Sequence, residues 1–212
     1  MSGLQNANRI FLLIVKSKMA EIEIYKNVKA LIFDCDGTLV DSMPIHNYSW
    51  ETAIKANGAE FNFDFFDSVK GMKSVDIVPL FNKTFGTNLI TQKVIEAKHR
   101  VFYEKLPHLK AIDPVVKIAK DYYKKLLMAV VSGGSGKIVK AELETVGILE
   151  LFDLILTADD DMKPKPAPDL FLYAAKHFNI SAQDCQVFED GELGIEAAIK
   201  AGMKITDVRD YI

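Results

Sequence analysis

A chain of 212 residues can bury a substantial apolar core as one domain and still has room for a modest insertion. Its composition, with 49% hydrophobic residues, 26% charged residues and a formal net charge of -3, is typical of a globular protein. The sequence has neither a basic tail nor a stripe of lysine and arginine, so the electrostatic attraction that dominates nucleic-acid binding is missing and we expect no nucleic-acid partner.

The first two dozen residues contain one apolar run, at 9–15. It is shorter than the core of a signal peptide, no small-residue cleavage site follows it, and it is far too short to cross a bilayer. We therefore predict that residues 1–24 form an N-terminal extension that the fold does not need, and we expect no membrane partner. Cys35 and Cys185 are too far apart in the sequence for a paired motif, which favours a reducing, cytoplasmic location.

Short apolar runs that end in polar or glycine residues recur along the chain and predict the buried strands of a parallel sheet. These runs cover residues 29–34, 127–131, 152–156, 185–188 and 204–208. Helical periodicity fills the gaps between the later runs, as in Val139, Leu143 and Val146 ahead of Gly147. Strands that alternate with helices predict an α/β fold, a Rossmann-like parallel sheet with helices on both faces.

Residues 43–106 lack strand patterns and consist of helical segments separated by glycines. We predict a small all-helical cap domain here, inserted after the first strand into a core made of residues 25–42 and 107–212. The aromatic cluster of this segment is expected to form the cap's own core rather than a substrate wall; it consists of Phe61, Phe63, Phe65 and Phe66. An insertion at the carboxyl edge of the first strand would lie over the usual ligand crevice of such a sheet as a lid.

Polar residues follow four of the predicted strands. In chain order they are Asp34 and Asp36, then Ser132, then Lys165, and finally Glu189 and Asp190. Parallel strands place their carboxyl ends at one edge of a sheet, so these side chains are expected to meet there. Each residue alone has an ordinary explanation as a turn or helix-cap residue, but coincidence is improbable for four groups in register.

Phosphoryl transfer explains these residue types, because it needs an in-line nucleophile, a proton donor for the leaving oxygen and positive charge around the equatorial oxygens. Asp34 is predicted to be the nucleophile and Asp36 the acid and base. Carboxylates this close repel one another unless a cation joins them, and an all-oxygen donor set suits Mg²⁺. Asp34 and Asp190 are the natural ligands of that ion.

The remaining residues of the set can hold the phosphate oxygens that the metal leaves free. Lys165 offers an ammonium, Ser132 a hydroxyl, and Gly133 and Gly134 backbone N–H groups. Thr38 is expected to orient Asp36 or the loop around it, or to act as an ordinary cap.

Together these residues resemble the four motifs of the haloacid dehalogenase superfamily, in the branch that contains beta-phosphoglucomutase and small sugar-phosphate phosphatases. The matching motifs lie at 34–38, 132, 165–169 and 187–190, within a resemblance that covers about residues 29 to 209. The resemblance implies a small helical cap and an aspartyl-phosphate intermediate on Asp34. It also implies Mg²⁺ held by Asp34, the backbone carbonyl of Asp36, Asp190 and Glu189. Finally, it draws attention to His46 and Trp50 as cap residues that line the substrate pocket.

One departure bears on the reaction. Mutases of this branch resemble one another in carrying an arginine shortly after the cap glycine, whereas here Gly71 is followed by Met72 and Lys73. Lys73 could substitute, but an ammonium lacks the bidentate fork that suits phosphate. We therefore favour a phosphohydrolase, with water as the final acceptor and a small sugar monophosphate as substrate. A beta-phosphoglucomutase-type isomerase and a non-catalytic binding module are the alternatives. A monomer whose partner is a small phosphate ester is expected.

Overall fold

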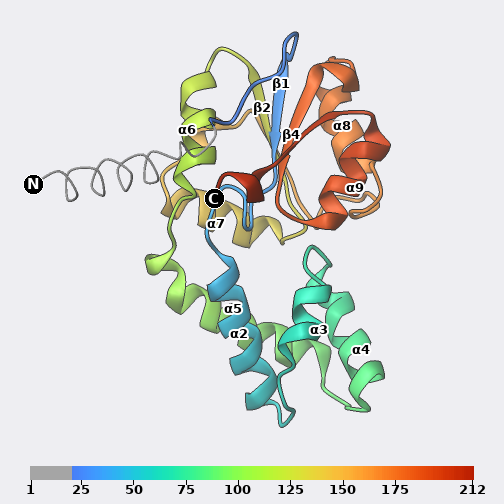
Figure 1. Cartoon of the computed structure of the whole chain (residues 1–212). Coiled ribbons are helices and arrows are strands. Elements are labelled where there is room, and N and C mark those ends of the chain that lie inside the picture. Colours follow the sequence, from blue (N-terminus) through green and yellow to red (C-terminus); the bar gives the residue numbers. More distant parts are fainter. Residues whose placement is uncertain (1–20) are drawn as a thin grey trace, which may run out of the picture.

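The computed structural model describes residues 21–212. In these residues helices flank a central sheet, and a further group of helices lies beyond the carboxyl ends of its strands (Figure 1). The sheet has five parallel strands in the order β3-β2-β1-β4-β5. Their bounds are β1 Ala30–Phe33, β2 Leu127–Val131, β3 Leu154–Leu156, β4 Cys185–Glu189 and β5 Lys204–Asp207. The predicted α/β fold is confirmed. Most of the predicted extension, residues 1–24, lies outside the described residues.

Helices cover both faces of the sheet. One face is covered by α6 Asp113–Tyr122 and α7 Gly136–Thr145, and the other by α8 Asp169–His177 and α9 Glu192–Ala201. Short 3-10 helices lie in the connecting segments, at η1 Leu106–His108, η2 Leu149–Leu151 and η3 Ala182–Asp184, and η4 Val208–Asp210 follows β5. Among the helices of residues 21–212, none combines the length and the apolar character needed to cross a bilayer.

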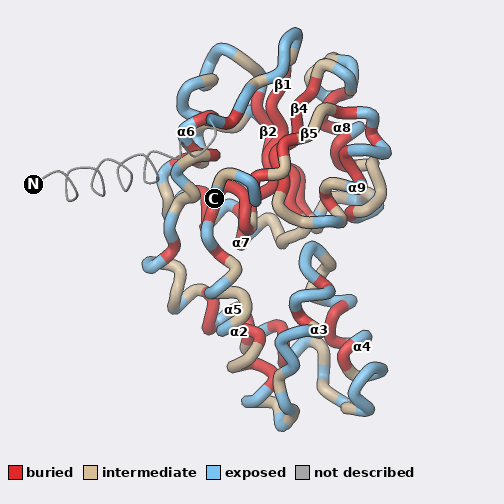
Figure 2. Tube along the Cα trace, viewed as in Figure 1, coloured by how far each residue is buried: buried red, intermediate tan, exposed pale blue. Residues whose placement is uncertain are grey.

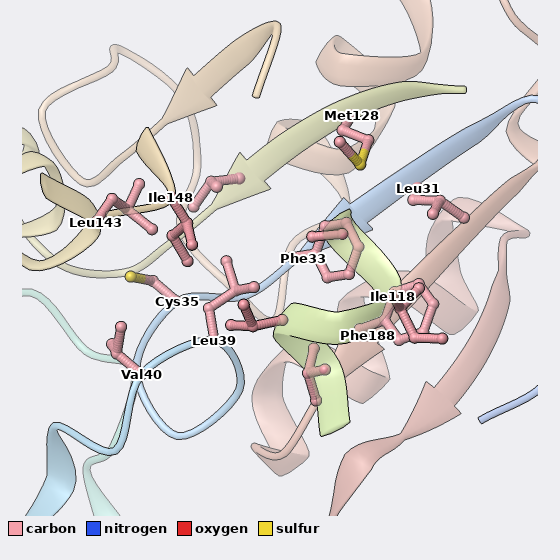
Figure 3. Packing of buried hydrophobic residues seen from close by; sticks show 14 of the residues in the cluster. Leu31, Phe33, Cys35, Leu39, Val40, Ile118, Met128, Leu143, Ile148 and Phe188 are labelled. Atoms are coloured by element: carbon pink, nitrogen blue, oxygen red, sulfur yellow. The ribbon is translucent and has the colours of Figure 1, made fainter. Parts of the chain in front are cut away.

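The alternation of side chains along β1 explains why the sheet has two cores. Leu31 and Phe33 pack with α6 and α7, while Ala30 and Ile32 pack with α8 and α9. Figure 2 shows the strands as the buried centre of this unit, and Figure 3 shows the first core, where Phe33 stacks on Phe188 with ring centroids 4.6 Å apart. A strand buried on both faces needs the unbroken apolar run that predicted it.

The segment between β1 and β2 is helical, as predicted, and has a hydrophobic core of its own. Its helices are α2 Met43–Ala56, α3 Phe63–Ser68, α4 Ser74–Phe85 and α5 Thr91–Lys105. Phe66 is buried in this core and Phe61 and Phe65 pack against it, so the expected role of the aromatic cluster is confirmed for these three. It is wrong for Phe63, whose surface is 54% exposed. The boundaries of a separate cap domain at 43 and 106 stay a prediction.

Candidate active site

The strand order creates a crevice at β1, because the chain continues to β2 on one side of this strand and returns to β4 on the other. Asp34 directly follows β1, Ser132 follows β2, and Glu189 is the last residue of β4. Lys165 reaches the same edge from the loop between β3 and α8. The structure therefore brings together the polar residues that the sequence singled out.

Lys165 is the buried cation at the centre of this edge. Its Nζ donates to Asp34 Oδ1 at 2.7 Å and to Glu189 Oε1 at 2.5 Å, and its side chain is 3% exposed. Burial alone would lower the pKa of Lys165, but the two carboxylates outweigh burial and raise it. Lys165 therefore carries a permanent positive charge beside Asp34.

Asp190 is held by the loop that follows β1. Thr38 Oγ1 donates to Asp190 Oδ1 at 3.0 Å, so this hydroxyl orients Asp190 and not Asp36, which was the first of the alternatives expected for Thr38. Gly37 has a φ of +84°, and a Cβ at this position would overlap the Asp190 carboxylate. Burial and Glu189 together raise the pKa of Asp190 to about 6, although the Thr38 hydrogen bond opposes them.

The acidic side chains at this edge fit a divalent cation. Asp34, Glu189 and Asp190 each offer an oxygen, and these oxygens lie within 4.8 Å of one another. Burial, followed by the neighbouring carboxylates, raises the pKa of Asp34 well above its usual range even though Lys165 opposes the shift. Two buried carboxylates and the half-buried one of Asp190 lie beside one ammonium, so ionising all three leaves an excess of negative charge. An all-oxygen donor set with such an excess suits Mg²⁺.

Gly194, in the first turn of α9, makes room for the side chain of Glu189, because a Cβ there would overlap the Glu189 carboxylate. We expect Gly194→Ala to displace Glu189 from Lys165 and to lower the free energy of unfolding by about 1–3 kcal/mol. Gly191→Ala is the matched control, since its Cβ would lie at an ordinary 3.4 Å from Glu189 Oε2. Chemical denaturation compares the two, and equal stabilities would contradict the expectation.

The loop after β2 presents the predicted phosphate-holding groups. Gly134 N donates to Ser132 Oγ at 3.0 Å, which folds the loop back on itself, and Ser132 is buried. A Cβ at Gly133 would overlap the carbonyl oxygen of Gly71 in the helical segment. The absence of a side chain at 133 therefore lets the helical segment approach the loop directly.

Asp36 lies on the same loop as Asp34 and accepts two short hydrogen bonds. Ser42 Oγ donates to Asp36 Oδ1 at 2.5 Å, and His46 Nε2 lies 2.7 Å from the same oxygen. Burial would raise the pKa of Asp36, but the charge of His46 and the hydrogen bonds from His46 and Ser42 outweigh burial and lower it well below its usual range. Burial and Lys98 act to lower the pKa of His46, but Asp36 outweighs both, so the pKa of His46 is raised. The pair thus holds a proton on His46 and a charge on Asp36.

Two charged residues that the sequence analysis did not single out lie next to this pair. Glu142, on α7, is fully buried, and burial and Asp36 raise its pKa to about 7. Lys98, on α5, is 3% exposed, and burial lowers its pKa to about 8. Its Nζ lies 5.1 Å from the centroid of the Phe102 ring and 5.7 Å from that of Trp50. Glu142 and Lys98 each fall on the apolar stripe of their helix. A charged residue in such a position is the sequence signal that could have identified them as functional candidates.

A cavity of about 560 Å³ lies between this edge of the sheet and the helical segment. Its wall includes the predicted cap residues His46 and Trp50. Among the described residues, the wall includes Lys70 but not Lys73, so the lysine that faces the cavity from this loop precedes Gly71 rather than following it. The wall thus combines the carboxylates and Lys165 at the sheet with Lys70, Lys98 and aromatic rings of the helical segment.

Known proteins resemble the chain over most of its length. A family profile described as haloacid dehalogenase-like hydrolase matches residues 31–208. The fructose-1-phosphate phosphatase YqaB of Escherichia coli is 30% identical over 190 residues, which are 88% of this chain and 99% of that protein. The beta-phosphoglucomutase of Bacillus subtilis is 30% identical over 187 residues, covering 83% of this chain and 81% of that protein.

Solved structures show the same fold. A hydrolase from Pseudomonas syringae superposes with a TM-score of 0.74 at 23% identity, covering 84% of this chain and 82% of that one. CbbY from Rhodobacter sphaeroides in complex with phosphate also has a TM-score of 0.74, at 20% identity and 84% coverage of both chains. The profile match spans most of the chain, and the matched residues include the carboxylates at the crevice beside β1. The chain belongs to the haloacid dehalogenase-like hydrolase family.

Proposed function

We propose that this hydrolase is a Mg²⁺-dependent phosphatase of small phosphate monoesters, with sugar phosphates as the substrate class and Asp34 as the nucleophile. The observation that carries the proposal is the position of Asp34, which lies within hydrogen-bonding distance of Lys165 and beside the acidic pair at the end of β4. A phosphoryl group at this point would meet a nucleophile, a fixed cation and a metal site together. The phosphatase and mutase named above, both relatives acting on phosphorylated sugars by their names, support this substrate class.

The first chemical step is transfer of the phosphoryl group to Asp34. A carboxylate oxygen of Asp34 bonds to phosphorus while the ester P–O bond breaks and leaves its electron pair on the sugar oxygen. Lys165, the Ser132 hydroxyl and the N–H group of Gly133 hold the equatorial oxygens, while the Gly134 N–H orients the Ser132 hydroxyl. Bound Mg²⁺, held by Asp34, Asp190, the Asp36 carbonyl and Glu189, would offset the repulsion between the carboxylate and the anionic substrate.

The proton for the leaving oxygen comes from the pair of Asp36 and His46. Asp36 is ionised at rest and His46 Nε2 lies 2.7 Å from its Oδ1, so the proton can pass through Asp36 to the sugar oxygen. His46 is then neutral and Asp36 is again a carboxylate. In the second step Asp36 takes a proton from a water molecule, whose oxygen bonds to phosphorus while the bond between Asp34 and phosphorus breaks. Inorganic phosphate leaves, Asp34 is again a carboxylate, and the proton passes from Asp36 back to His46.

The test is a panel of sugar monophosphates incubated with Mg²⁺ or with EDTA, in which released phosphate and isomerised sugar are measured separately. We expect phosphate release that requires Mg²⁺ and little isomerisation. Efficient isomerisation with little release would instead identify a beta-phosphoglucomutase-type reaction through the same phospho-Asp34. If no ester were turned over, the proposal would fail and a binding role would remain.

Magnesium affinity should depend on pH because its ligands must be ionised. The pKa of Asp190 is raised to about 6 by burial and by Glu189, so this carboxyl is largely protonated below that pH in the metal-free protein. We expect the affinity for Mg²⁺ to increase as the pH rises through 6. Calorimetric titration without substrate, between about pH 5 and pH 8, measures it. An affinity that does not change over this range would contradict the expectation.

A further inference from the structure

Glu142 lies behind the acid and base pair, on a core helix that faces the helical segment. His46 comes from α2 of that segment, whereas Glu142 comes from α7. The imidazole Nε2 lies 3.4 Å from Glu142 Oε1 and 2.7 Å from Asp36 Oδ1. The other carboxylate oxygen of Glu142 accepts from Cys35 Sγ at 3.5 Å, on the residue between Asp34 and Asp36.

The carboxylate of Glu142 is placed in a way that packing alone does not explain. Its side chain is fully buried, and within residues 21–212 its Oε1 has no hydrogen-bond partner. A buried carboxylate oxygen without a hydrogen-bond partner lowers the stability of the fold, so the polar group nearest to it is the one expected to compensate. That neighbour is His46 Nε2, and the ring of Phe102 stacks on the imidazole with a centroid distance of 4.5 Å.

We propose that Glu142 is a positioning residue for the phosphatase reaction, which holds the imidazole of His46 so that Nε2–H points at Asp36 and its proton can reach the leaving oxygen. This inference rests on the proposed function. Glu142 Oε1 meets the imidazole from α7 of the core, while the ring of Phe102 stacks on it from α5 of the helical segment. Because Glu142 and His46 belong to the core and to the helical segment, their contact also keeps the acid in place where the two units meet.

The leaving group separates a positioning role from a structural one. A sugar alkoxide needs a proton as it departs, whereas p-nitrophenolate is a good leaving group that does not. We expect Glu142→Gln, which keeps the shape of the side chain, to lower kcat/KM about 10- to 100-fold for the best sugar phosphate of the panel. For p-nitrophenyl phosphate the loss should stay within about threefold, because transfer to Asp34 no longer depends on the acid. Glu144→Gln is the matched control, an exposed glutamate on the same helix, and should resemble the wild type with both esters.

Equal losses with both esters, or no loss with either, would overturn the proposal. If Glu142→Gln does not fold, Glu142→Asp keeps the charge at a shorter reach, and we expect it to show the same preference for p-nitrophenyl phosphate to a smaller degree. An equal loss with both esters in that variant would also overturn the proposal. Failure of the proposed function is distinguishable, since the wild-type protein would then hydrolyse neither ester.

Discussion

Asp34→Asn should abolish turnover of every phosphate ester, with a loss on the order of 10⁴-fold or more in kcat. The amide cannot form the aspartyl phosphate, and no other carboxylate at the end of β1 has the same place beside Lys165. The fold should persist, because an amide oxygen can still accept from Lys165 and one of several crowded negative charges is removed. Steady-state rates with Mg²⁺ and thermal melting of the same preparation measure the two effects.

Asp41→Asn is the control for this variant. Asp41 is exposed and only a few residues away on the same loop. We expect the Asp41→Asn variant to hydrolyse esters at the wild-type rate. Near-normal rates in Asp34→Asn, or an equal loss in both variants, would remove Asp34 from the role of nucleophile.

Asp36→Asn should block the proton transfers while leaving the metal site intact. We expect kcat/KM for sugar phosphates to fall by about 10²- to 10⁴-fold, because an amide cannot pass the proton from His46 to the leaving oxygen. Magnesium affinity should change little, since Asp36 is expected to contribute its backbone carbonyl rather than its side chain. With p-nitrophenyl phosphate the first step should still proceed, and the phosphorylated protein should accumulate because water lacks its base.

Mass spectrometry of the intact protein detects that accumulation as the addition of one phosphoryl group. Calorimetry with Mg²⁺ checks the metal site in the same variant. The assignment of Asp36 would be contradicted if sugar phosphates were hydrolysed at near-normal rates. It would also be contradicted if Mg²⁺ binding disappeared, because the side chain would then act mainly as a ligand.

Much of this site could be predicted because its parts lie at the ends of strands. The apolar runs identify the strands, and parallel strands bring their carboxyl ends to one edge whatever the distance along the chain. Asp34, Ser132 and Glu189 meet for that reason. Lys165 also arrives there, although eight residues separate it from the end of β3.

The contacts made by helices were harder to predict, because they depend on how two units pack. Glu142 and Glu144 stand two residues apart on α7, yet one is fully buried and the other is exposed. Only the phase of the apolar stripe separates them, since Glu142 follows Val139 by three residues on the buried face. The partner of Glu142 could not be inferred, because His46 belongs to another helix whose orientation no local pattern specifies.

The division of the cavity wall has an evolutionary consequence. The side formed by the core includes the residues that would perform the chemistry, whereas the opposite side comes from one continuous stretch between residues 43 and 106. A single exchange of coding sequence could therefore replace the whole recognition surface and give the same reaction a new substrate. His46 limits this freedom, because its bond to Asp36 belongs to the chemistry although its helix belongs to the exchangeable stretch. Recombined descendants that keep their activity should therefore retain a histidine at this point of α2.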